Sequence, residues 1–297
     1  MKTILVTGKL GQVGFELQRS LAVLGQVVAV DRDECDLTDV TAIGALLDRV
    51  RPDIIVNPAA HTAVDKAESE PALAEAINAA APQVLAQWAA QHQALLVHYS
   101  TDYVFDGSQP GWYAETDSPN PQSVYGKTKL AGELAIQASG CRHLIFRTSW
   151  VFGAHGGNFA KTMLRLARER EELKVVADQH GAPTSAALLA DVTAQVLAQY
   201  LHAKNPADFP FGLYHLVAAG RTSWHEYAQA VVGEALARGI ALKLDQSAIL
   251  PIPTSAYPLP APRPANSGLS TDKLRSTFGL TLPEWQQGLA HVMQLIC

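Results

Sequence analysis

Cysteine, basic charge and long apolar runs are all scarce in this 297-residue sequence. Its three cysteines, Cys35, Cys141 and Cys297, are scattered and show no CxxC or Cys/His ligand spacing, which argues against a disulfide framework and a structural zinc site. The formal net charge is -5 and no Lys/Arg block is present, so nucleic acid and anionic membranes are poor partners. No apolar run reaches the ~18 residues of a membrane span, and the start, MKTILVTG, lacks a cleavage-type region. We therefore expect a cytoplasmic protein that binds small molecules.

The first half of the sequence contains a regular alternation of apolar runs and helical patterns. Strands that are apolar throughout and are separated by helices indicate a parallel sheet covered on both faces. We expect an α/β fold with a Rossmann-type doubly wound parallel sheet, whose first domain spans residues 1–150. An Ala-rich segment predicts one long helix over 71–92. The predicted strands are TILVT (3–7), VVAV (27–30), DIIVN (53–57), ALLVHYS (94–100) and HLIFRTS (143–149).

Beyond residue 150 the alternation loosens, and we expect a smaller C-terminal α/β lobe over 151–297, with some segments returning to the first domain. Many of the 17 prolines fall in PIPTSAYPLPAPRPANS (251–267). This composition predicts either a linker or a rigid loop laid over the second lobe, and the helical pattern that follows it favours the loop. Helices are predicted over 157–170, 185–201 and 224–238, and strands over 173–177 and 212–218.

The loop TGKLGQVG joins the first strand to the first helix and contains three evenly spaced glycines, Gly8, Gly11 and Gly14. Glycine lets the turn close and lets the backbone approach a pyrophosphate, while the helix N-terminus presents free N–H groups to the anion. Asp31 follows the second strand, where a carboxylate can bond the adenosine ribose of NAD and repel the 2′-phosphate of NADP. Arg32 could instead pair with that phosphate, so the choice between NADH and NADPH stays open. The first domain is therefore predicted to bind NAD(P).

Tyr125 and Lys129 lie four residues apart in SVYGKTKLAGELA (123–135), and so on one face of an expected helix. Hydride transfer from a nicotinamide to a ketone leaves an alkoxide that needs a proton. A tyrosine with its ordinary pKa of about 10 donates poorly at neutral pH, but a neighbouring ammonium favours the phenolate and lowers that pKa. We therefore predict Tyr125 as the proton donor and Lys129 as the group that lowers its pKa, with Thr101 orienting the substrate oxygen.

Ligands of open α/β sheets bind beyond the carboxyl ends of the strands. NPAAHTAVDKAE leaves the third strand at that edge and STDYVFDG leaves the fourth. Four side chains are therefore predicted to face the same crevice as the glycine loop: Thr62, Ser100, Thr101 and Asp102. Hydrogen-bonded packing, rather than metal binding, is expected for three histidines that lie at no ligand spacing: His61, His98 and His180.

Three motifs resemble the extended short-chain dehydrogenase/reductase family: TGKLGQVG, STDYVFDG and YGKTKLAGE. Others are similar to the dTDP-4-dehydrorhamnose reductase family within it, over essentially the whole chain: NPAAHTAVDKAESEP, FRTSWVFG, NFAKTML, DQHGAPT and RPANSGLST. The resemblance implies NAD(P)H-dependent reduction of the C4 ketone of dTDP-4-dehydro-L-rhamnose to dTDP-L-rhamnose. It implies a catalytic set at Thr101, Tyr125 and Lys129, and a C-terminal lobe that binds the nucleotide-sugar substrate.

The resemblance also assigns contacts to individual positions. Substrate contacts map to Thr101, Asp102 and Trp150. From residue chemistry, Trp150 at the end of the fifth strand can stack on a sugar or base and hydrogen-bond it. Arg263 and Asn266 in the proline-rich loop can clamp the diphosphate and sugar. Coenzyme contacts map to Gly11, Gln12, Val13, Asp31, Asp36, Leu37, Ala60, His61, Thr62, Tyr125 and Lys129.

Some members of the resembled family hold Mg2+ at a dimer contact through glutamates. Glu16 matches one such position, whereas Ala187 and Gln286 stand where acids are expected. These departures argue against a metal-bridged homodimer and leave the chemistry untouched. We expect no metal ligands in this chain, and a homodimer stays open.

Alternative functions stay open on the same scaffold. One is an epimerase or another 4-ketoreductase of nucleotide sugars. A 4,6-dehydratase is disfavoured because Asp102 and Tyr103 follow Thr101, where Asp-Glu is typical of that class. A non-catalytic NAD(P)-binding subunit is disfavoured because Thr101, Tyr125 and Lys129 are all intact.

Overall fold

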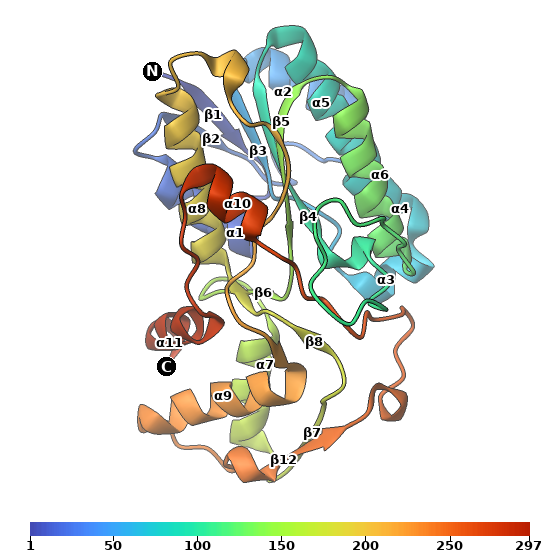
Figure 1. Cartoon of the computed structure of the whole chain (residues 1–297), viewed down its shortest axis with the longest axis vertical. Coiled ribbons are helices and arrows are strands. Elements are labelled where there is room, and N and C mark those ends of the chain that lie inside the picture. The colour runs from blue at the N-terminus through green and yellow to red at the C-terminus, as the bar shows by residue number, and fades with distance from the viewer.

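The computed structural model describes all 297 residues and shows an α/β fold built on one six-stranded sheet (Figure 1). The strand order is β10-β5-β4-β3-β1-β2, and every neighbouring pair is parallel. The prediction of a Rossmann-type doubly wound sheet is therefore confirmed. The strands are β1 (Thr3–Val6), β2 (Gln26–Ala29), β3 (Ile54–Asn57), β4 (Leu95–Thr101), β5 (Arg142–Thr148) and β10 (Gly212–His215).

Helices cover both faces of this sheet because its strands are apolar on both sides. On β1, Ile4 packs into one core with helices α1, α8 and α10, while Leu5 packs into a second core with α2, α5 and α6. Burying each such side chain contributes roughly 1.5–3 kcal/mol of transfer free energy. The covering helices are α1 (Gln12–Leu21), α2 (Val40–Val50), α5 (Ala81–His92), α6 (Val124–Ala138), α8 (Ala186–Leu201) and α10 (Asp272–Phe278).

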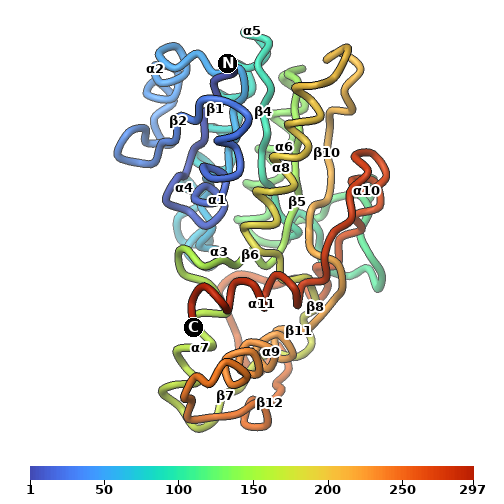
Figure 2. The backbone as a smooth tube through the Cα atoms, turned by 90° about the vertical axis from the view of Figure 1, so that its left-hand side faces the viewer, coloured from blue at the N-terminus to red at the C-terminus, as the bar shows by residue number.

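A second lobe lies beyond the carboxyl ends of the strands and has its own apolar core (Figure 2). The boundary at residue 150 stays a prediction; α8 and β10, which follow it, pack with the first-domain sheet. None of the helices combines the length and the apolar character that crossing a membrane requires. The lobe contains α7 (Phe159–Glu169), α9 (Trp224–Ala237), α11 (Trp285–Ile296) and the paired strands β7 (Leu173–Val176) and β12 (Ile249–Ile252). Short pairs join β6 (Val151–Phe152) to β9 (Thr184–Ser185) and β8 (His180–Gly181) to β11 (Thr222–Ser223).

Two segments differ from the sequence-based expectation. The stretch 251–267 was expected to be a loop, but Pro251 lies in β12, where it pairs in register with Val175. The predicted helix over 71–92 is divided into α4 (Pro71–Glu75), a π-helical turn (Ala76–Ala80) and α5. Pro82 has no N–H for a regular helical bond, which is consistent with the change of winding just before it. The other short helices are α3 (Val64–Ser69) and 3-10 turns at 102–104, 206–208, 246–248 and 254–256.

A buried ion pair ties α6 to the sheet. Arg147 on β5 donates to the Glu133 carboxylate on α6, from Nε at 2.9 and 3.2 Å and from Nη2 at 2.6 Å. The two side chains are only 3% and 1% exposed. The guanidinium also lies over the Phe105 ring, 5.0 Å from its centroid. Because α6 carries Tyr125 and Lys129, this pair helps to hold both residues against the sheet.

Glu133→Gln is expected to lower the free energy of unfolding by about 3–5 kcal/mol, because it leaves Arg147 as an uncompensated buried charge. The double variant E133L/R147M removes both charges and should recover most of that loss. Urea denaturation followed by circular dichroism measures each change. As a matched control, Glu169→Gln breaks an exposed pair with Arg165 and should cost at most about 1 kcal/mol. Equal losses for the buried and the exposed variants would contradict the prediction.

Candidate active site

A cavity of about 720 Å3 opens at the carboxyl ends of the sheet strands and is closed on one side by residues of the second lobe. Ser100 and Thr148 line it, and the buried hydroxyl of each has no hydrogen-bond partner in the protein. They are therefore free to bond a ligand. The predicted site residues that line the cavity are Gly8, Gly11, Gln12, Val13, Gly14, Asp31, Arg32, Asp36, Leu37, Ala60, Thr62, Thr101, Asp102, Tyr125, Lys129 and Trp150.

The glycine loop has a shape that suits a bound diphosphate. Gly8 has a φ of 60°, and Gly11 N donates to Gly8 O at 3.0 Å. A Cβ on Gly14 would lie 2.0 Å from Gly8 O, so α1 approaches the loop more closely than any side chain would allow. No side chain caps α1 at Gly11, and Gln12 and Val13 line the cavity. The first N–H groups of the helix are therefore available to an anion.

Asp31 lines the cavity and also braces the glycine loop. Its Oδ2 accepts a hydrogen bond from Leu10 N at 2.9 Å, and its Oδ1 accepts one from Arg32 N at 2.8 Å. Lys9, in the same loop, is paired with Glu34. The carboxylate expected to contact a ribose therefore already holds the backbone of the loop in place, so its substitution affects loop shape as well as charge.

Thr101 and Tyr125 reach the cavity from the end of β4 and the start of α6. The Ser123 hydroxyl accepts from Gly126 N at 3.1 Å and caps the helix just before Tyr125. Thr101 Oγ1 donates to Asp102 Oδ1 at 3.0 Å. Burial raises the pKa of Tyr125 to about 12; the Thr101 hydroxyl lowers this pKa, and the Asp102 charge raises it.

Lys129 is held by β4 rather than by the tyrosine. Its Nζ donates to Tyr99 O at 2.6 Å and lies 3.0 Å from His98 Nε2. Burial lowers the pKa of Lys129 to about 8, whereas the charge of Glu133 raises it. Burial has the largest effect on the pKa of Tyr125 in this structure, and the lowering of that pKa by Lys129 stays a prediction.

Trp150 enters the cavity in an unusual backbone conformation, with a φ of 47°. Its indole is stacked on Trp224, with ring centroids 3.6 Å apart and an interplanar angle of 12°. Gly181 packs against the same indole, since a Cβ there would lie 2.7 Å from Cε2 of Trp150. One face of the indole is therefore already covered by another ring, which was not expected from the sequence. Its role in substrate binding stays a prediction.

Three predicted site residues do not line the cavity: His61, Arg263 and Asn266. The backbone N–H of His61 donates to the Asn78 side chain at 2.8 Å. Arg263 donates to Asp65 at 2.7 Å. Asn266 donates to two carbonyls of the 109–111 loop, at 2.7 and 2.6 Å, and its Oδ1 accepts from Gly268 N. These groups hold loops together in this structure, and their ligand contacts stay predictions.

The sequence analysis missed the part of the cavity formed by the second lobe. Gly156, Gly157 and Trp224 all line it. The segment 153–158 is tied to the glycine loop region, because His155 Nε2 lies 2.9 Å from Leu10 O and Asn158 Nδ2 donates to Gln12 Oε1 at 3.0 Å. The glycine-rich sequence GAHGG (153–157) was the feature from which this segment could have been predicted. Nothing local marks Trp224, which is brought to the site by packing.

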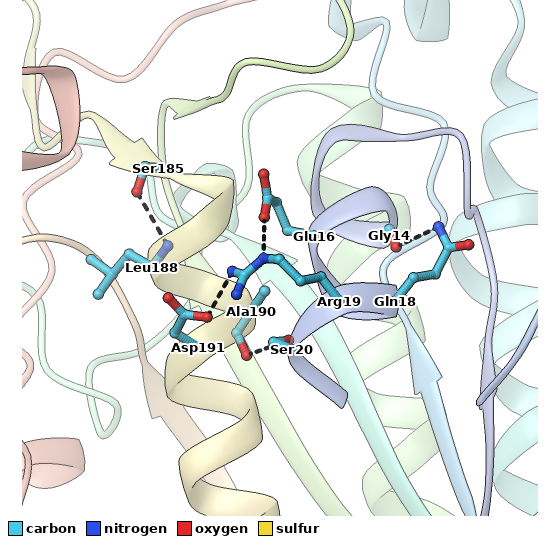
Figure 3. A network of polar contacts seen from close by, with 9 residues as sticks. All are labelled: Gly14, Glu16, Gln18, Arg19, Ser20, Ser185, Leu188, Ala190 and Asp191. Atoms are coloured by element: carbon cyan, nitrogen blue, oxygen red, sulfur yellow. Dashed lines mark hydrogen bonds and ion pairs between the residues drawn. The ribbon is translucent and has the colours of Figure 1, made fainter. Parts of the chain in front are cut away.

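Glu16, the position compared with a metal ligand, faces α8 from α1 (Figure 3). Arg19 donates to Glu16 at 3.2 Å and to Asp191 at 2.9 Å, and so bridges the two carboxylates. Figure 3 shows these three side chains together at the junction of the two helices. The Glu16 carboxylate is thus paired with a guanidinium, and the absence of a metal-bridged dimer stays a prediction.

The fold and the cavity together define an extended short-chain dehydrogenase/reductase: a Rossmann-type sheet, a glycine loop before α1, an acid after β2, and a Tyr/Lys pair on α6 beside Thr101. The fold is shared by the crystal structure of UDP-glucose 4-epimerase from Thermus thermophilus in complex with NAD. That structure has a TM-score of 0.78 and 21% identity, over 99% of this chain and 98% of that one.

Closer similarities identify the family. Residues 1–296 match the family described as RmlD substrate binding domain. The dTDP-4-dehydrorhamnose reductase of Salmonella typhimurium is 52% identical over 98% of this chain and 96% of that protein, and the one from Burkholderia thailandensis is 53% identical over 95% of each. The crystal structure of the Bacillus anthracis dTDP-4-dehydrorhamnose reductase in complex with NADP has a TM-score of 0.87 and 35% identity, over 99% of both chains. This chain belongs to the dTDP-4-dehydrorhamnose reductase family of oxidoreductases, and the predicted membership is confirmed.

Gly14→Ala is expected to weaken NADPH binding at least tenfold, about 1.4 kcal/mol, because a Cβ 2.0 Å from Gly8 O forces loop and helix apart. Fluorescence titration with NADPH measures the Kd. Gly44→Ala is the matched control: no atom stands within 4 Å of the added Cβ, and alanine inside α2 should stabilise the protein by about 0.5–1 kcal/mol. An unchanged Kd for the Gly14 variant would show that the close approach of α1 is unnecessary for dinucleotide binding.

Proposed function

We propose that this chain reduces the C4 ketone of dTDP-4-dehydro-L-rhamnose to dTDP-L-rhamnose with NADPH or NADH. The observation that carries the proposal is that Thr101, Tyr125 and Lys129 share one cavity with the glycine loop, in a chain of the dTDP-4-dehydrorhamnose reductase family. Hydride donor and proton donor therefore meet the substrate in the same place. The NADP bound to the Bacillus anthracis relative supports the coenzyme class.

The coenzyme supplies a hydride to C4 of the sugar when it is bound. The uncapped first turn of α1, at Gln12 and Val13, fits its diphosphate. Asp31, Asp36 and Leu37 line the end of the cavity assigned to the adenosine. The unpartnered hydroxyls of the cavity supply further polar groups for the coenzyme or the substrate.

The side chains of this protein supply the proton and the orientation. Tyr125 transfers its phenol proton to the ketone oxygen and keeps the O–H bonding electrons as phenolate. Thr101 orients the phenol, since its hydroxyl interacts with that of Tyr125 and lowers the pKa of the phenol, which leaves the phenol proton for the ketone oxygen. Lys129 has one N–H left for the cavity, and its positive charge stabilises the phenolate.

A product analysis tests the proposed function. The protein is supplied with a dTDP-4-keto-6-deoxy sugar, the 3,5-epimerase that acts on it, and NADPH or NADH. We expect loss of absorbance at the reduced-nicotinamide band and formation of dTDP-L-rhamnose. A different deoxysugar would indicate another nucleotide-sugar 4-ketoreductase. Epimerised product without net coenzyme consumption would indicate an epimerase, and coenzyme binding without product would indicate a non-catalytic subunit. The cytoplasmic location and a homodimer stay predictions.

Tyr125→Phe is expected to lower kcat by about 10²–10⁴-fold, since the phenol is the proton donor. The Kd for NADPH should change by less than about twofold, because the ring and the helix remain. Tyr257→Phe is the control: that tyrosine is exposed and lies outside the cavity, so both quantities should be unchanged. Steady-state kinetics and fluorescence titration make the two measurements. Wild-type turnover in the Tyr125 variant would remove this residue from the mechanism.

Asp31→Asn should raise the ratio of kcat/KM for NADPH over that for NADH about tenfold, because it removes the charge that repels a 2′-phosphate. Asparagine keeps an oxygen acceptor for the loop backbone, whereas Asp31→Ala would release Leu10 N and disturb the loop. Asp33→Asn, an exposed neighbour outside the cavity, serves as the matched control. Equal ratios in the wild type and the Asp31 variant would rule out a charge effect on coenzyme choice.

A further inference from the structure

A chain of buried polar side chains runs behind Lys129 across three strands. Thr7 Oγ1, just after β1, lies 2.5 Å from Asn57 Oδ1 on β3. Asn57 Nδ2 lies 3.1 Å from His98 Nδ1 on β4, and His98 Nε2 lies 3.0 Å from Lys129 Nζ. All four side chains are at most 1% exposed. Thr7 and Lys129 both line the cavity, so the chain begins and ends at the proposed active site.

The number of hydrogen-bond donors on Lys129 determines which ring nitrogen of His98 carries the proton. An ammonium has three N–H donors and no acceptor. When Lys129 is an ammonium, it directs one N–H at Tyr99 O and a second at His98 Nε2, which leaves the third for the cavity. Nε2 can accept only when the neutral imidazole carries its proton on Nδ1. That Nδ1–H must then donate to an oxygen, and the group opposite is the Asn57 amide.

The Asn57 amide can offer His98 either an oxygen or an NH2, since a half-turn exchanges the two with almost no change of shape. With Oδ1 toward His98, Nδ1–H donates, Nε2 accepts and Lys129 is an ammonium. With Nδ2 toward His98, Nδ1 accepts, and Nε2–H donates to a neutral Lys129 amine. The Thr7 hydroxyl completes either pattern because it can donate or accept. Each charge state of Lys129 therefore has its own complete set of hydrogen bonds.

We propose that Asn57 and His98 are positioning residues that couple the charge of Lys129 to the tautomer of a neutral, buried imidazole. The proposal rests on the proposed function, because it concerns the lysine assigned to that reaction. Neither residue lines the cavity, so both act through Lys129. The pattern with Nδ1–H holds the ammonium that the phenolate of Tyr125 requires, and it leaves a single N–H of Lys129 directed at the cavity.

The surrounding charges are consistent with this arrangement. Burial lowers the pKa of His98 well below its ordinary value, and the charge of Lys129 lowers it further, so the imidazole stays neutral at pH 7. The pKa of Lys129, about 8, brings both of its charge states within an ordinary pH range. The other titratable groups near the pair are Tyr125 and Glu133 on α6, and Glu133 is engaged by Arg147 of β5. Tyr99 offers the pair only its backbone carbonyl, because its phenol bonds Thr193 on α8.

Nitrogen NMR of the whole protein labelled with 15N-histidine tests the coupling directly. His98 is assigned by its loss in His98→Gln or, if that variant does not fold, by the signal that changes in Lys129→Met. We expect the Nδ1–H tautomer near pH 6.5 and a change toward Nε2–H as the pH rises past about 8. His215 is the internal control: it is equally buried, its Nδ1 lies 3.1 Å from Tyr113 O, and its tautomer should not change. One fixed tautomer of His98 over this range, or a doubly protonated ring, would overturn the proposal.

The pH profile of kcat/KM gives a second readout. His98→Leu removes an acceptor from the ammonium, so the pKa of Lys129 falls and the alkaline limb should move down by about one pH unit. His98→Gln keeps an oxygen acceptor, so its alkaline limb should lie close to that of the wild type. His215→Leu should leave the alkaline limb where it is in the wild type. A profile unmoved in His98→Leu, with only stability lost, would mean that His98 is merely structural. A tautomer change in a protein that reduces no sugar would refute the proposed function and leave the coupling intact.

Discussion

Removal of the Lys129 amine from water is the constraint on which the site depends. A buried cation is costly unless each of its N–H groups finds an acceptor, and Lys129 is 1% exposed. The carbonyl of Tyr99 and the ring of His98 can serve as two of these acceptors only if β4 and α6 keep their present separation. The ion pair of Glu133, one helical turn further along α6, with Arg147 holds the same helix against the neighbouring strand β5. The geometry of the site and the stability of the fold therefore rest on the same helix–sheet contact.

The parallel sheet explains why residues far apart in sequence converge. Each strand of the sheet ends at the same edge, so the segments after β1, β3, β4 and β5 all open into one cavity.

The π-helical turn before α5 also connects segments that are distant in sequence. It places Asn78 so that its amide holds both the N–H and the carbonyl of His61 and contacts Thr128 of α6. An irregularity in one helix thereby fastens the loop after β3 to the helix that carries the tyrosine.

The second lobe contributes two features to the site, of which only one could be recognised from the sequence. The glycines of 153–158 are visible, and their segment contacts the first lobe through Leu10 and Gln12. The stack of Trp150 on Trp224 is not visible, because the two residues are more than seventy positions apart and meet only when α9 packs against the end of β5. The stack also accompanies the positive φ of Trp150, a conformation that a bulky residue adopts only when its surroundings hold it there.

The sequence by itself determined the sheet, the glycine loop and the order of Thr101, Tyr125 and Lys129, because apolar periodicity, glycine spacing and helical spacing are local properties. Only the tertiary structure decided that His61, Arg263 and Asn266 bond to residues outside the cavity, and that Pro251 lies in a strand. It alone raised the pKa of Tyr125 and surrounded Lys129 with Asn57 and His98. Burial and hydrogen-bond partners are the reason, since both depend on which distant segments pack together, and residue spacing along the chain carries no record of that packing.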